Sequence, residues 1–323
     1  MNNHIFIVCS PLQLSIVSKI KKEFSVFDNE FHVLYLKANS IINNGIRKNI
    51  LTEYDSYLIS GMDYGIFNFK HIMRFISKIK NGNLFVYLAN ANDLTVHYIL
   101  SNIKSDFIIR TFDDGILNIN TIKNIDLELK EKRKIKHKLT KLFYQNNYSI
   151  KRIINESDVH YTILDNNRKL NVKSKLVKIN LFDFDFKNNV QKENINIFIG
   201  SKFKDILRDK NEENFNLLLS KIRELSRQYP NIIYLRHPRE NLIDAFSMIE
   251  KSVDTISEDF IIKLISDGHS VNLIGFASTC QLNLMKMNNV KITLLRTNLI
   301  REDIFESFLL FDLSRELIII DLD

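Results

Sequence analysis

Five short polar segments of this chain each follow directly on a run of apolar residues, and their side chains are of types that bind anions or transfer protons. The last three segments offer hydroxyls, a helix start and a His between Arg residues, which together favour a phosphate group. Two adjacent carboxylates in the second segment would supply a general base if both lined a cleft. The segments are Ser10-Pro11-Leu12-Gln13, Asp113-Asp114-Gly115, Gly200-Ser201, Arg236-His237-Pro238-Arg239 and Ala277-Ser278-Thr279.

Each of these segments also has a purely structural interpretation. Pro238 restricts the backbone beside His237, but a single His at a strand end often has only a structural role. Ser278 before a helix is first of all an N-cap. Two Asp residues before a Gly are also typical of a turn that leads into a helix. These alternatives remain open at the level of single residues.

The composition is that of a globular protein with a modest preference for anions. The chain has 323 residues, 45 Lys and Arg against 38 Asp and Glu, a net charge of +7, and 45% hydrophobic residues. Only 8 Gly and 3 Pro are present, which excludes collagen-like, flexible-linker and Pro-rich classes. The charge would suit nucleic acid, an anionic membrane or an anionic substrate, and composition does not choose among them.

Cysteines and apolar runs predict where the protein resides. Cys9 and Cys280 lie far apart in apolar sequence, so the chain offers neither a disulfide framework nor a zinc ligand set. The N-terminus lacks a basic region and a signal-like apolar run, and no stretch approaches the roughly 18 apolar residues of a membrane span. We expect a cytoplasmic protein, with the inner face of the cell membrane as a peripheral site.

The elements that carry the five segments alternate between short apolar runs and amphipathic stretches, which predicts parallel strands joined by helices. The pattern predicts an α/β fold of two Rossmann-like wound domains that face a cleft. The first, residues 1–180, has strands at 5–8, 33–36, 84–88 and 107–109, and its sheet ends near 115. Polar, irregular sequence fills 170–194, of which 181–194 is the predicted connector. The second domain, 195–323, has strands at 195–199, 232–235, 271–276 and 290–295 and helices at 212–227 and 260–265.

The strongest charge feature is a basic helix predicted within residues 125–155. Residues 130–141 contain seven Lys and Arg residues and a single acidic residue, Glu131. Ile135, Leu139, Leu142 and Phe143 recur at helical spacing. Such a helix is either a solvated face or a contact for anionic lipid or an acidic glycan. Nucleic acid is not indicated, because no nucleic-acid-binding motif accompanies the charge.

Several familiar catalytic motifs are missing from the sequence. There is no GxGxxG, Walker A, HExxH or Gly-x-Ser-x-Gly pattern, which argues against dinucleotide, P-loop, zinc-protease and α/β-hydrolase sites. Asp183-Phe184-Asp185 has the spelling of a metal-binding sugar transferase motif, but it lies in the predicted connector and is better interpreted as an exposed edge. We therefore predict no metal.

Taken in order, the polar segments resemble the bacterial lipooligosaccharide and capsular polysaccharide sialyltransferase family over residues 5 to 300. The motifs that carry the resemblance are Phe112-Asp113-Asp114-Gly115, Ser157-Asp158 with His160-Tyr161-Thr162-Ile163, Ile199-Gly200-Ser201, His237-Pro238-Arg239, Glu258-Asp259 and Ser278. The resemblance implies a GT-B-like enzyme that transfers sialic acid from CMP-sialic acid to a terminal galactose of a lipooligosaccharide or capsule, α2,3 or α2,6, with inversion and without metal or cofactor. It also implies a homodimer.

Residue roles follow from the same resemblance. His237 would contact the CMP phosphate and act as general acid, Ser278 with Thr279 would hold that phosphate, and Glu258 would bind the cytidine ribose. Gly200 and Ser201 would lie near the donor. The remaining predicted substrate contacts are Gln13, Asp113, Gly115, Pro238 and Arg239.

The general base departs from the family pattern. An Asp two residues after the Gly-Ser pair serves in lipooligosaccharide members, but here that position is Phe203. Either Asp205 substitutes, or Asp114 is the base, as in related bacterial sialyltransferases that use the second acid of the Asp-Asp-Gly motif. Two other functions stay open: a transferase of the same fold for another nucleotide sugar, such as a glucosyl donor, and a non-catalytic protein that binds acidic polysaccharide or membrane.

Overall fold

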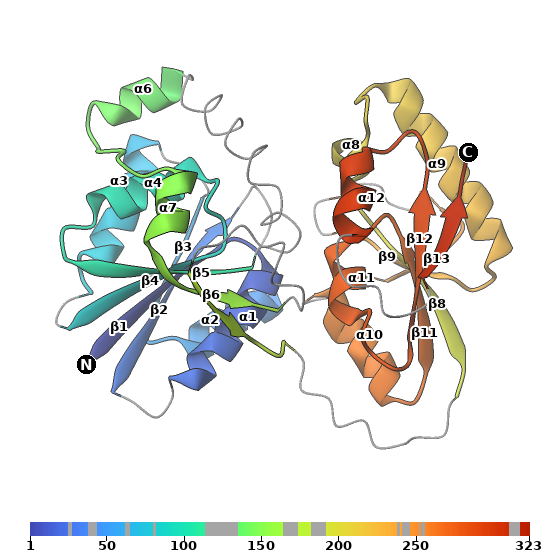
Figure 1. The fold of residues 1–323 in the computed structure, drawn as a ribbon, viewed down its shortest axis with the longest axis horizontal. Coiled ribbons are helices and arrows are strands. Elements are labelled where there is room, and N and C mark those ends of the chain that lie inside the picture. The colour runs from blue at the N-terminus through green and yellow to red at the C-terminus, as the bar shows by residue number, and fades with distance from the viewer. Residues whose placement is uncertain are drawn as a thin grey trace. The chain divides into compact units, whose positions relative to one another are not determined.

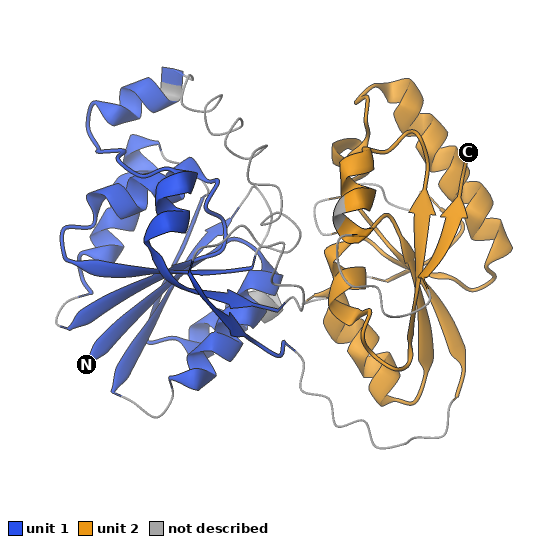
Figure 2. Ribbon diagram, in the orientation of Figure 1, with its two compact units in different colours: residues 1–183 blue, residues 184–323 orange. Residues whose placement is uncertain are grey.

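A computed structural model gives the chain two compact units, residues 1–183 and 184–323 (Figure 2). The structure describes residues 1–24, 28–37, 44–61, 65–79, 82–113, 135–163, 174–181, 192–237, 240, 246–251, 253, 256–309 and 317–323. The division between the units falls within the predicted connector 181–194, of which 182–191 lie outside the described residues. The Asp183-Phe184-Asp185 motif lies outside them as well.

The first unit is built on a parallel sheet of seven strands in the order β3-β2-β1-β4-β5-β6-β7 (Figure 1). Chain order runs outward from β1 to β3, then reverses and runs from β4 to β7 on the other side. This reversal is the hallmark of a doubly wound sheet. The strands are β1 (Asn2–Val8), β2 (Asn29–Lys37), β3 (Ser56–Gly61), β4 (Asn83–Leu88), β5 (Phe107–Phe112), β6 (Ser157–Thr162) and β7 (Lys175–Lys178).

Alternation along β1 shows how both faces of this sheet are covered. Ile5 and Ile7 belong to a core with helices α3, α4 and α7, whereas Phe6 and Val8 belong to a core with α1 and α2. Successive side chains of a strand point to opposite faces, so a strand buried on both sides is apolar throughout. The helices are α1 (Pro11–Glu23), α2 (Asn44–Glu53), α3 (Ile66–Ile76), α4 (Leu94–Asn102), α6 (Ile135–Lys141) and α7 (Ile150–Glu156).

The prediction that the first sheet ends near residue 115 is wrong, because β6 and β7 extend it. Strand β6 has the sequence SDVHYT, in which buried His160 and Thr162 replace the apolar residues that mark a strand. Strand β7 lies in the stretch predicted as irregular. Polar side chains that find partners inside the fold therefore hid two strands from an argument based on apolar runs.

The predicted basic helix 125–155 is also wrong as a single element. Residues 125–134 lie outside the described part, and the remainder forms α6 and α7 with non-helical residues 142–149 between them. The side chains of α6 that face inward are polar, since His137 and Thr140 are buried. The hydroxyl oxygen of Tyr98 in α4 lies 3.1 Å from Nδ1 of His137. The predicted apolar stripe faces outward instead, with exposed fractions of 75% for Ile135, 53% for Leu139, 76% for Leu142 and 66% for Phe143.

The second unit repeats the same winding with a six-stranded parallel sheet in the order β10-β9-β8-β11-β12-β13. Its strands are β8 (Asn194–Ile199), β9 (Ile233–Leu235), β10 (Ile249–Lys251), β11 (Ser270–Gly275), β12 (Val290–Arg296) and β13 (Leu317–Asp321). Its helices are α8 (Phe203–Ile206), α9 (Glu212–Gln228), α10 (Ser257–Ser266), α11 (Thr279–Leu284) and α12 (Glu302–Leu309).

Helix α9 shows why elements of the second unit could be predicted from the sequence. Its buried residues recur every three or four positions and pack on Phe198 of β8, Tyr234 of β9 and Ile274 of β11. Asn211 caps the helix, since its side-chain oxygen accepts a hydrogen bond of 2.7 Å from the N–H of Asn214. The apolar period and the cap together fix both ends of the element.

Candidate functional site

Three polar segments of the second unit meet at the carboxyl edge of its sheet. Gly200 follows β8, His237 follows β9 and Ser278 follows β11, and these three strands are neighbours in the order β9-β8-β11. Adjacent strands lie about 4.8 Å apart, so the three loops start within roughly 10 Å of one another. The chain order reverses between β8 and β11, which is where ligands bind in open α/β sheets.

Gly200 allows the β8 and β9 loops to touch. Its N–H donates to the carbonyl of Leu235 at 2.8 Å, and a Cβ at this position would lie 2.8 Å from the backbone N of His237. A side chain would therefore force the two loops apart. Ser201 beside it is buried, and His237 is half-buried.

Glu240 ties the His237 loop to the start of α8, a role that the sequence did not reveal. Its N–H donates to the carbonyl of His237 at 2.9 Å, and its Oε2 accepts from the N–H of Phe203 at 3.0 Å. The position predicted to lack a base, Phe203, is thus a fully buried core residue that contributes a backbone donor. Pro238 and Arg239 lie outside the described residues.

Arg236 does not add its charge to His237 as the sequence suggested. Its Nε lies 2.9 Å from Glu250 Oε1 on the neighbouring strand β10, an ion pair within the sheet edge. An arginine held by a carboxylate has its charge largely compensated. The positive character expected on that side of His237 is therefore reduced.

The turn into α11 is held by a capping box. Ser278 Oγ accepts from the N–H of Gln281 at 3.1 Å, and Gln281 Oε1 accepts from the N–H of Ser278 at 3.0 Å. Fully buried Gln281 also donates to the carbonyls of Leu273 and Thr293 at 3.0 and 3.1 Å. Because the cap uses Ser278 Oγ as an acceptor, its hydroxyl hydrogen remains a donor for a ligand. Thr279 adds a second half-buried hydroxyl.

The same turn contains a backbone conformation that is rare outside glycine. Ala277, directly before Ser278, has φ of 51°. A left-handed non-glycine residue is strained, and such strain gathers at functional sites. Gln281, which braces this turn from below, is the main site residue that the sequence argument missed; the only signal was the Ser-x-x-Gln spelling of a capping box.

Glu258 is a carboxylate buried in the first turn of α10, which starts after β10 at this same edge. Only 5% of it is exposed, and its Oε1 accepts from Asn283 Nδ2 of α11 at 3.0 Å. Burial raises the pKa of Glu258 above its ordinary value. A carboxyl group is costly to bury, and this one lies beside the helix that begins at the Ser278 turn.

Asp205 does not have the surroundings of a free base. It lies in α8 with its side chain 53% exposed, and its carboxylate is 2.6 Å from Lys202 Nζ and 3.8 Å from Lys210 Nζ. These two ammonium groups compensate the negative charge of the carboxylate and occupy its oxygens. Its geometry is that of a surface ion pair.

At the carboxyl edge of the first sheet, Asp113 is a fully buried network centre. Its Oδ1 lies 3.0 Å from His160 Nε2, and its Oδ2 accepts from Thr162 Oγ1 at 2.8 Å and from the N–H of Ile163 at 2.7 Å. Thr111 Oγ1 in turn lies 2.8 Å from His160 Nδ1. These contacts join the ends of β5 and β6. The predicted substrate contact of Asp113 does not fit this burial, and the neighbouring Asp114 and Gly115 lie outside the described residues.

Gln13, another predicted substrate contact, is likewise buried. Its Oε1 accepts from the N–H of Cys9 at 2.7 Å, and its own N–H donates to Ser10 Oγ at 3.2 Å. The side chain thus closes the turn between β1 and α1. A direct substrate contact does not fit that position.

Two further features of the described residues concern metal ions and membranes. No cluster of three or more His, Cys, Asp or Glu side chains suited to a metal ion occurs among them. None of the helices that the structure describes is long and apolar enough to cross a membrane.

Comparison with known proteins places this geometry in a family context. The model of glycosyltransferase family 52 matches residues 28–299. The chain is 30% identical over 313 residues to an N-acetyllactosaminide alpha-2,3-sialyltransferase of Haemophilus influenzae, covering 92% of this chain and 93% of that protein. It is 26% identical over 303 residues to a CMP-N-acetylneuraminate:beta-galactoside alpha-2,3-sialyltransferase of Pasteurella multocida, covering 91% of each.

Solved structures resemble the chain in fold. The GT-B domain of a sialyltransferase from Photobacterium damselae superposes with a TM-score of 0.52 at 12% identity, over 99% of this chain and 100% of that one. MnaA of S. aureus with UDP gives 0.53 at 11% identity, over 92% and 80%. These likenesses confirm the predicted pair of Rossmann-like domains of GT-B type.

Proposed function

Since this chain belongs to glycosyltransferase family 52, which confirms the resemblance drawn from its motifs, we propose that it transfers sialic acid from CMP-sialic acid to a terminal galactose. One observation carries the proposal: Gly200, His237 and Ser278 converge at the carboxyl ends of adjacent strands in the second unit. A transferase for another nucleotide sugar is not favoured, because both curated relatives are named sialyltransferases.

The donor site follows from the charge that develops on the leaving group. When the bond between the anomeric carbon and the phosphate oxygen breaks, CMP leaves with an additional negative charge. In our proposal protonated His237 gives its proton to that phosphate, and the hydroxyls of Ser278 and Thr279 donate to the same group. Donors fixed in place by the Gln281 brace stabilise this charge without reorganising. Glu258 accepts from the ribose hydroxyls.

The acceptor hydroxyl must lose its proton as it attacks, and we propose Asp114 as the base. Asp205, the alternative, is held by Lys202 and Lys210. Asp113 is enclosed by His160, Thr162 and Ile163, so we propose that it positions the segment that carries Asp114. Attack on the face opposite the phosphate inverts the configuration of the anomeric carbon. In this proposal protein side chains stabilise the charge on the phosphate and accept the proton of the acceptor hydroxyl, so no metal is included.

The acceptor and linkage are proposed from the named relatives. Both are named alpha-2,3-sialyltransferases, and their names refer to N-acetyllactosaminide and beta-galactoside acceptors. We propose an α2,3 linkage to the terminal galactose of a bacterial surface glycan, as lipooligosaccharide or capsule.

Incubation with CMP-sialic acid and lactose or N-acetyllactosamine tests the proposal. Release of CMP and a sialylated galactoside, in the presence of EDTA, is the expected result, and NMR of the product gives linkage and anomeric configuration. Thermal shift should favour CMP over UDP, since a ligand at a hundred times its Kd adds about 2.7 kcal/mol. Absence of CMP release with every galactoside tried, or transfer only from a UDP-sugar, would overturn it.

We also propose that α6 holds the enzyme against an anionic membrane surface, at the cytoplasmic side. Exposed Ile135 and Leu139 of this helix, and Leu142 and Phe143 directly after it, lie near exposed Lys138 and Lys141. Apolar residues that insert and lysines that meet lipid phosphates are the two contributions to interfacial binding. Lys130, Lys132, Arg133 and Lys134 of the basic run lie outside the described residues.

The family resemblance also predicts a homodimer, and a dimer interface over these exposed apolar side chains is the alternative explanation for them. Vesicle co-sedimentation distinguishes membrane binding from such an interface. Binding to vesicles with anionic lipid should fall in the double variant Leu139→Ser/Phe143→Ser and at high salt. Sedimentation velocity of the same variant reports the oligomeric state. A shift from dimer to monomer with unchanged vesicle binding would assign the face to self-association instead.

A further inference from the structure

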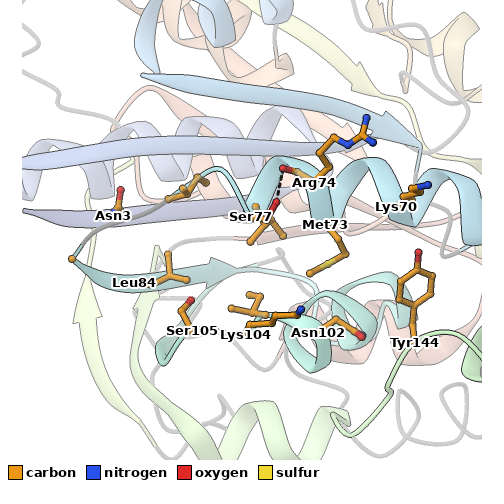
Figure 3. Close-up of a pocket in the computed structure, with 14 residues that line it drawn as sticks. Asn3, Lys70, Met73, Arg74, Ser77, Leu84, Asn102, Lys104, Ser105 and Tyr144 are labelled. Atoms are coloured by element: carbon orange, nitrogen blue, oxygen red, sulfur yellow. Dashed lines mark hydrogen bonds between the residues drawn. The ribbon is translucent and has the colours of Figure 1, made fainter.

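A groove lies between α3 and α4 of the first unit, away from the carboxyl edge where Asp113 is found. Its volume is about 910 Å³, in the range of small-molecule sites. It runs from Lys70 and Tyr144 at one end to Leu84 and Ser105 at the other (Figure 3). Leu84 and Ser105 stand at the starts of β4 and β5, so this end of the groove opens at the amino edge of the sheet.

The floor of the groove is apolar and only partly covered by the protein itself. Ile76 and Leu84 are buried, whereas the other floor residues are half-buried. Tyr144 closes one end by packing edge-on against Phe69, with ring centroids 4.6 Å apart. A ligand that covered this floor would gain about 25 cal/mol for each Å² of apolar surface removed from water. The floor consists of Met73, Ile76, Ile79, Leu84, Ile103 and Tyr144.

The rim of the groove is cationic on both sides. Lys70 and Arg74 stand one helical turn apart on α3, and Lys104 faces them from the loop after α4 (Figure 3). All three are exposed, and none forms an ion pair with any residue in the described part of the chain. Like charges at this helical spacing repel each other. Helix α3 carries no acidic residue, and Asp106 lines the adjacent hollow together with Lys104 and Arg152 without an ion pair to either.

An apolar floor below an uncompensated cationic rim matches one class of ligand. We propose that the groove binds a single-chain anionic amphiphile, with its acyl chain along the floor and its phosphate or carboxylate among Lys70, Arg74 and Lys104. A free phosphate would leave the floor uncovered, and a neutral lipid would leave the rim unpaired. Exposed Leu142 and Phe143 directly precede Tyr144, so an apolar surface adjoins one end of the groove. The site does not depend on the proposed transfer reaction.

Isothermal titration with palmitoyl lysophosphatidylglycerol below its micelle concentration tests the proposal. Saturable 1:1 binding is expected, with much weaker binding of glycerol 3-phosphate, which has the head group alone, and of palmitoyl lysophosphatidylcholine, which is zwitterionic. Binding of all three to the same degree, or no saturation below the micelle concentration, would overturn it.

Variants separate the two halves of the site. The triple variant Lys70→Glu/Arg74→Glu/Lys104→Glu should weaken the anionic amphiphile about tenfold or more, as three lost contacts of surface strength predict. A matched triple reversal in the second unit, Lys251→Glu/Lys263→Glu/Lys291→Glu, should leave it unchanged. Met73→Trp should fill the groove and weaken binding of the amphiphile without a change in charge. If Met73→Trp does not fold, Ile103→Phe serves as the groove-filling variant.

Transfer to soluble lactose provides the readout that keeps this proposal apart from the proposed function. The Lys70→Glu/Arg74→Glu/Lys104→Glu variant should release CMP at the wild-type rate, because none of these residues belongs to the donor site. Equal affinity of this variant and wild type for lysophosphatidylglycerol would overturn the groove proposal, whatever the activity. Loss of all transfer in wild type would overturn only the function.

Discussion

The two units share a winding order yet treat the polar residues at their carboxyl edges differently. In the first unit, Asp113 and Gln13 are buried and their side-chain oxygens are occupied by protein donors. In the second unit, His237, Ser278 and Thr279 are only half-buried at the equivalent edge. The same topology therefore delivers polar loops to both edges, but His237, Ser278 and Thr279 keep part of their surface exposed, whereas Asp113 and Gln13 are buried.

The difference teaches that a strand-end position is necessary for a site and does not suffice. A carboxylate that accepts hydrogen bonds from three protein groups stabilises the loop that holds it and has little capacity left for substrate. A serine that accepts one capping bond still has a proton to donate. Variants at both edges test whether Asp113 is structural and the second edge is chemical, beginning with the largest effect.

Replacement of His237 should produce the largest change. His237→Ala is expected to lower turnover of CMP-sialic acid by about two to four orders of magnitude, the usual contribution of a general acid. The melting temperature should change little, because the ring is half-buried. Initial rates of CMP release measure the effect, and exposed His71→Ala is the control. Activity near wild type would remove His237 from the mechanism.

Replacement of Asp113 should act on stability instead. Asp113→Ala leaves His160, Thr162 and the N–H of Ile163 without their acceptor, and each unsatisfied buried group costs about 1–3 kcal/mol, so a loss of about 3 kcal/mol or more is expected. Urea unfolding measures it, with exposed Asp106→Ala as the control. Asp114→Asn should instead slow transfer by about two orders of magnitude. A stable, inactive Asp113→Ala would reverse our assignment of the pair.

Two glycines give a smaller and more local comparison. Gly200→Ala places a Cβ 2.8 Å from backbone atoms of His237 and Leu235, so we expect a loss of about 1–3 kcal/mol and slower transfer as the His237 loop moves. Gly61→Ala in the first unit meets only Asn68 Nδ2 at 3.8 Å and should be tolerated. Melting curves and CMP release on both variants measure this. Equal effects would show that the close approach at Gly200 is not restrictive.

Glu258 gives the smallest effect, and its sign depends on pH. Because burial raises its pKa in the folded state, the folded protein binds this proton more tightly than the unfolded chain, and stability falls as pH rises towards the raised pKa. Glu258→Gln removes this penalty, so the variant should be more stable than wild type by about 1 kcal/mol at pH 8, with a smaller gap at pH 5.

The same Glu258→Gln change should weaken CMP binding about tenfold, since hydrogen bonds to charged groups exceed neutral ones by about 1–2 kcal/mol. Calorimetric melting at pH 5 and pH 8 and titration with CMP measure both effects. Asp259→Asn, an exposed neighbour in the same helix turn, is the control. A variant that is less stable at pH 8, or that binds CMP as wild type does, would contradict a ligand-binding role for the buried acid.

Prediction from sequence succeeded for elements whose buried side chains are apolar and failed for elements whose buried side chains are polar. The apolar run at residues 5–8 of strand β1 and the apolar period of helix α9 were found directly. Strand β6 was missed because His160 and Thr162 occupy its buried positions, and their Asp113 partner lies more than forty residues away in the chain. The apolar spacing around α6 did not show which face lies inward: buried His137 contacts Tyr98, while Ile135 and Leu139 stay exposed.

The sequence by itself determined the class of fold, the order of the polar segments and the family, because strand period and motif order are properties of one dimension. Only the tertiary structure decided which polar groups form hydrogen bonds or ion pairs within the protein and which can still bind a ligand. Gln281 bonded to the carbonyl of Thr293, Glu250 against Arg236 and His160 against Asp113 are all contacts between neighbouring strands or the segments that leave them. Such contacts arise when parallel strands bring distant residues to the same edge, and no local pattern records them.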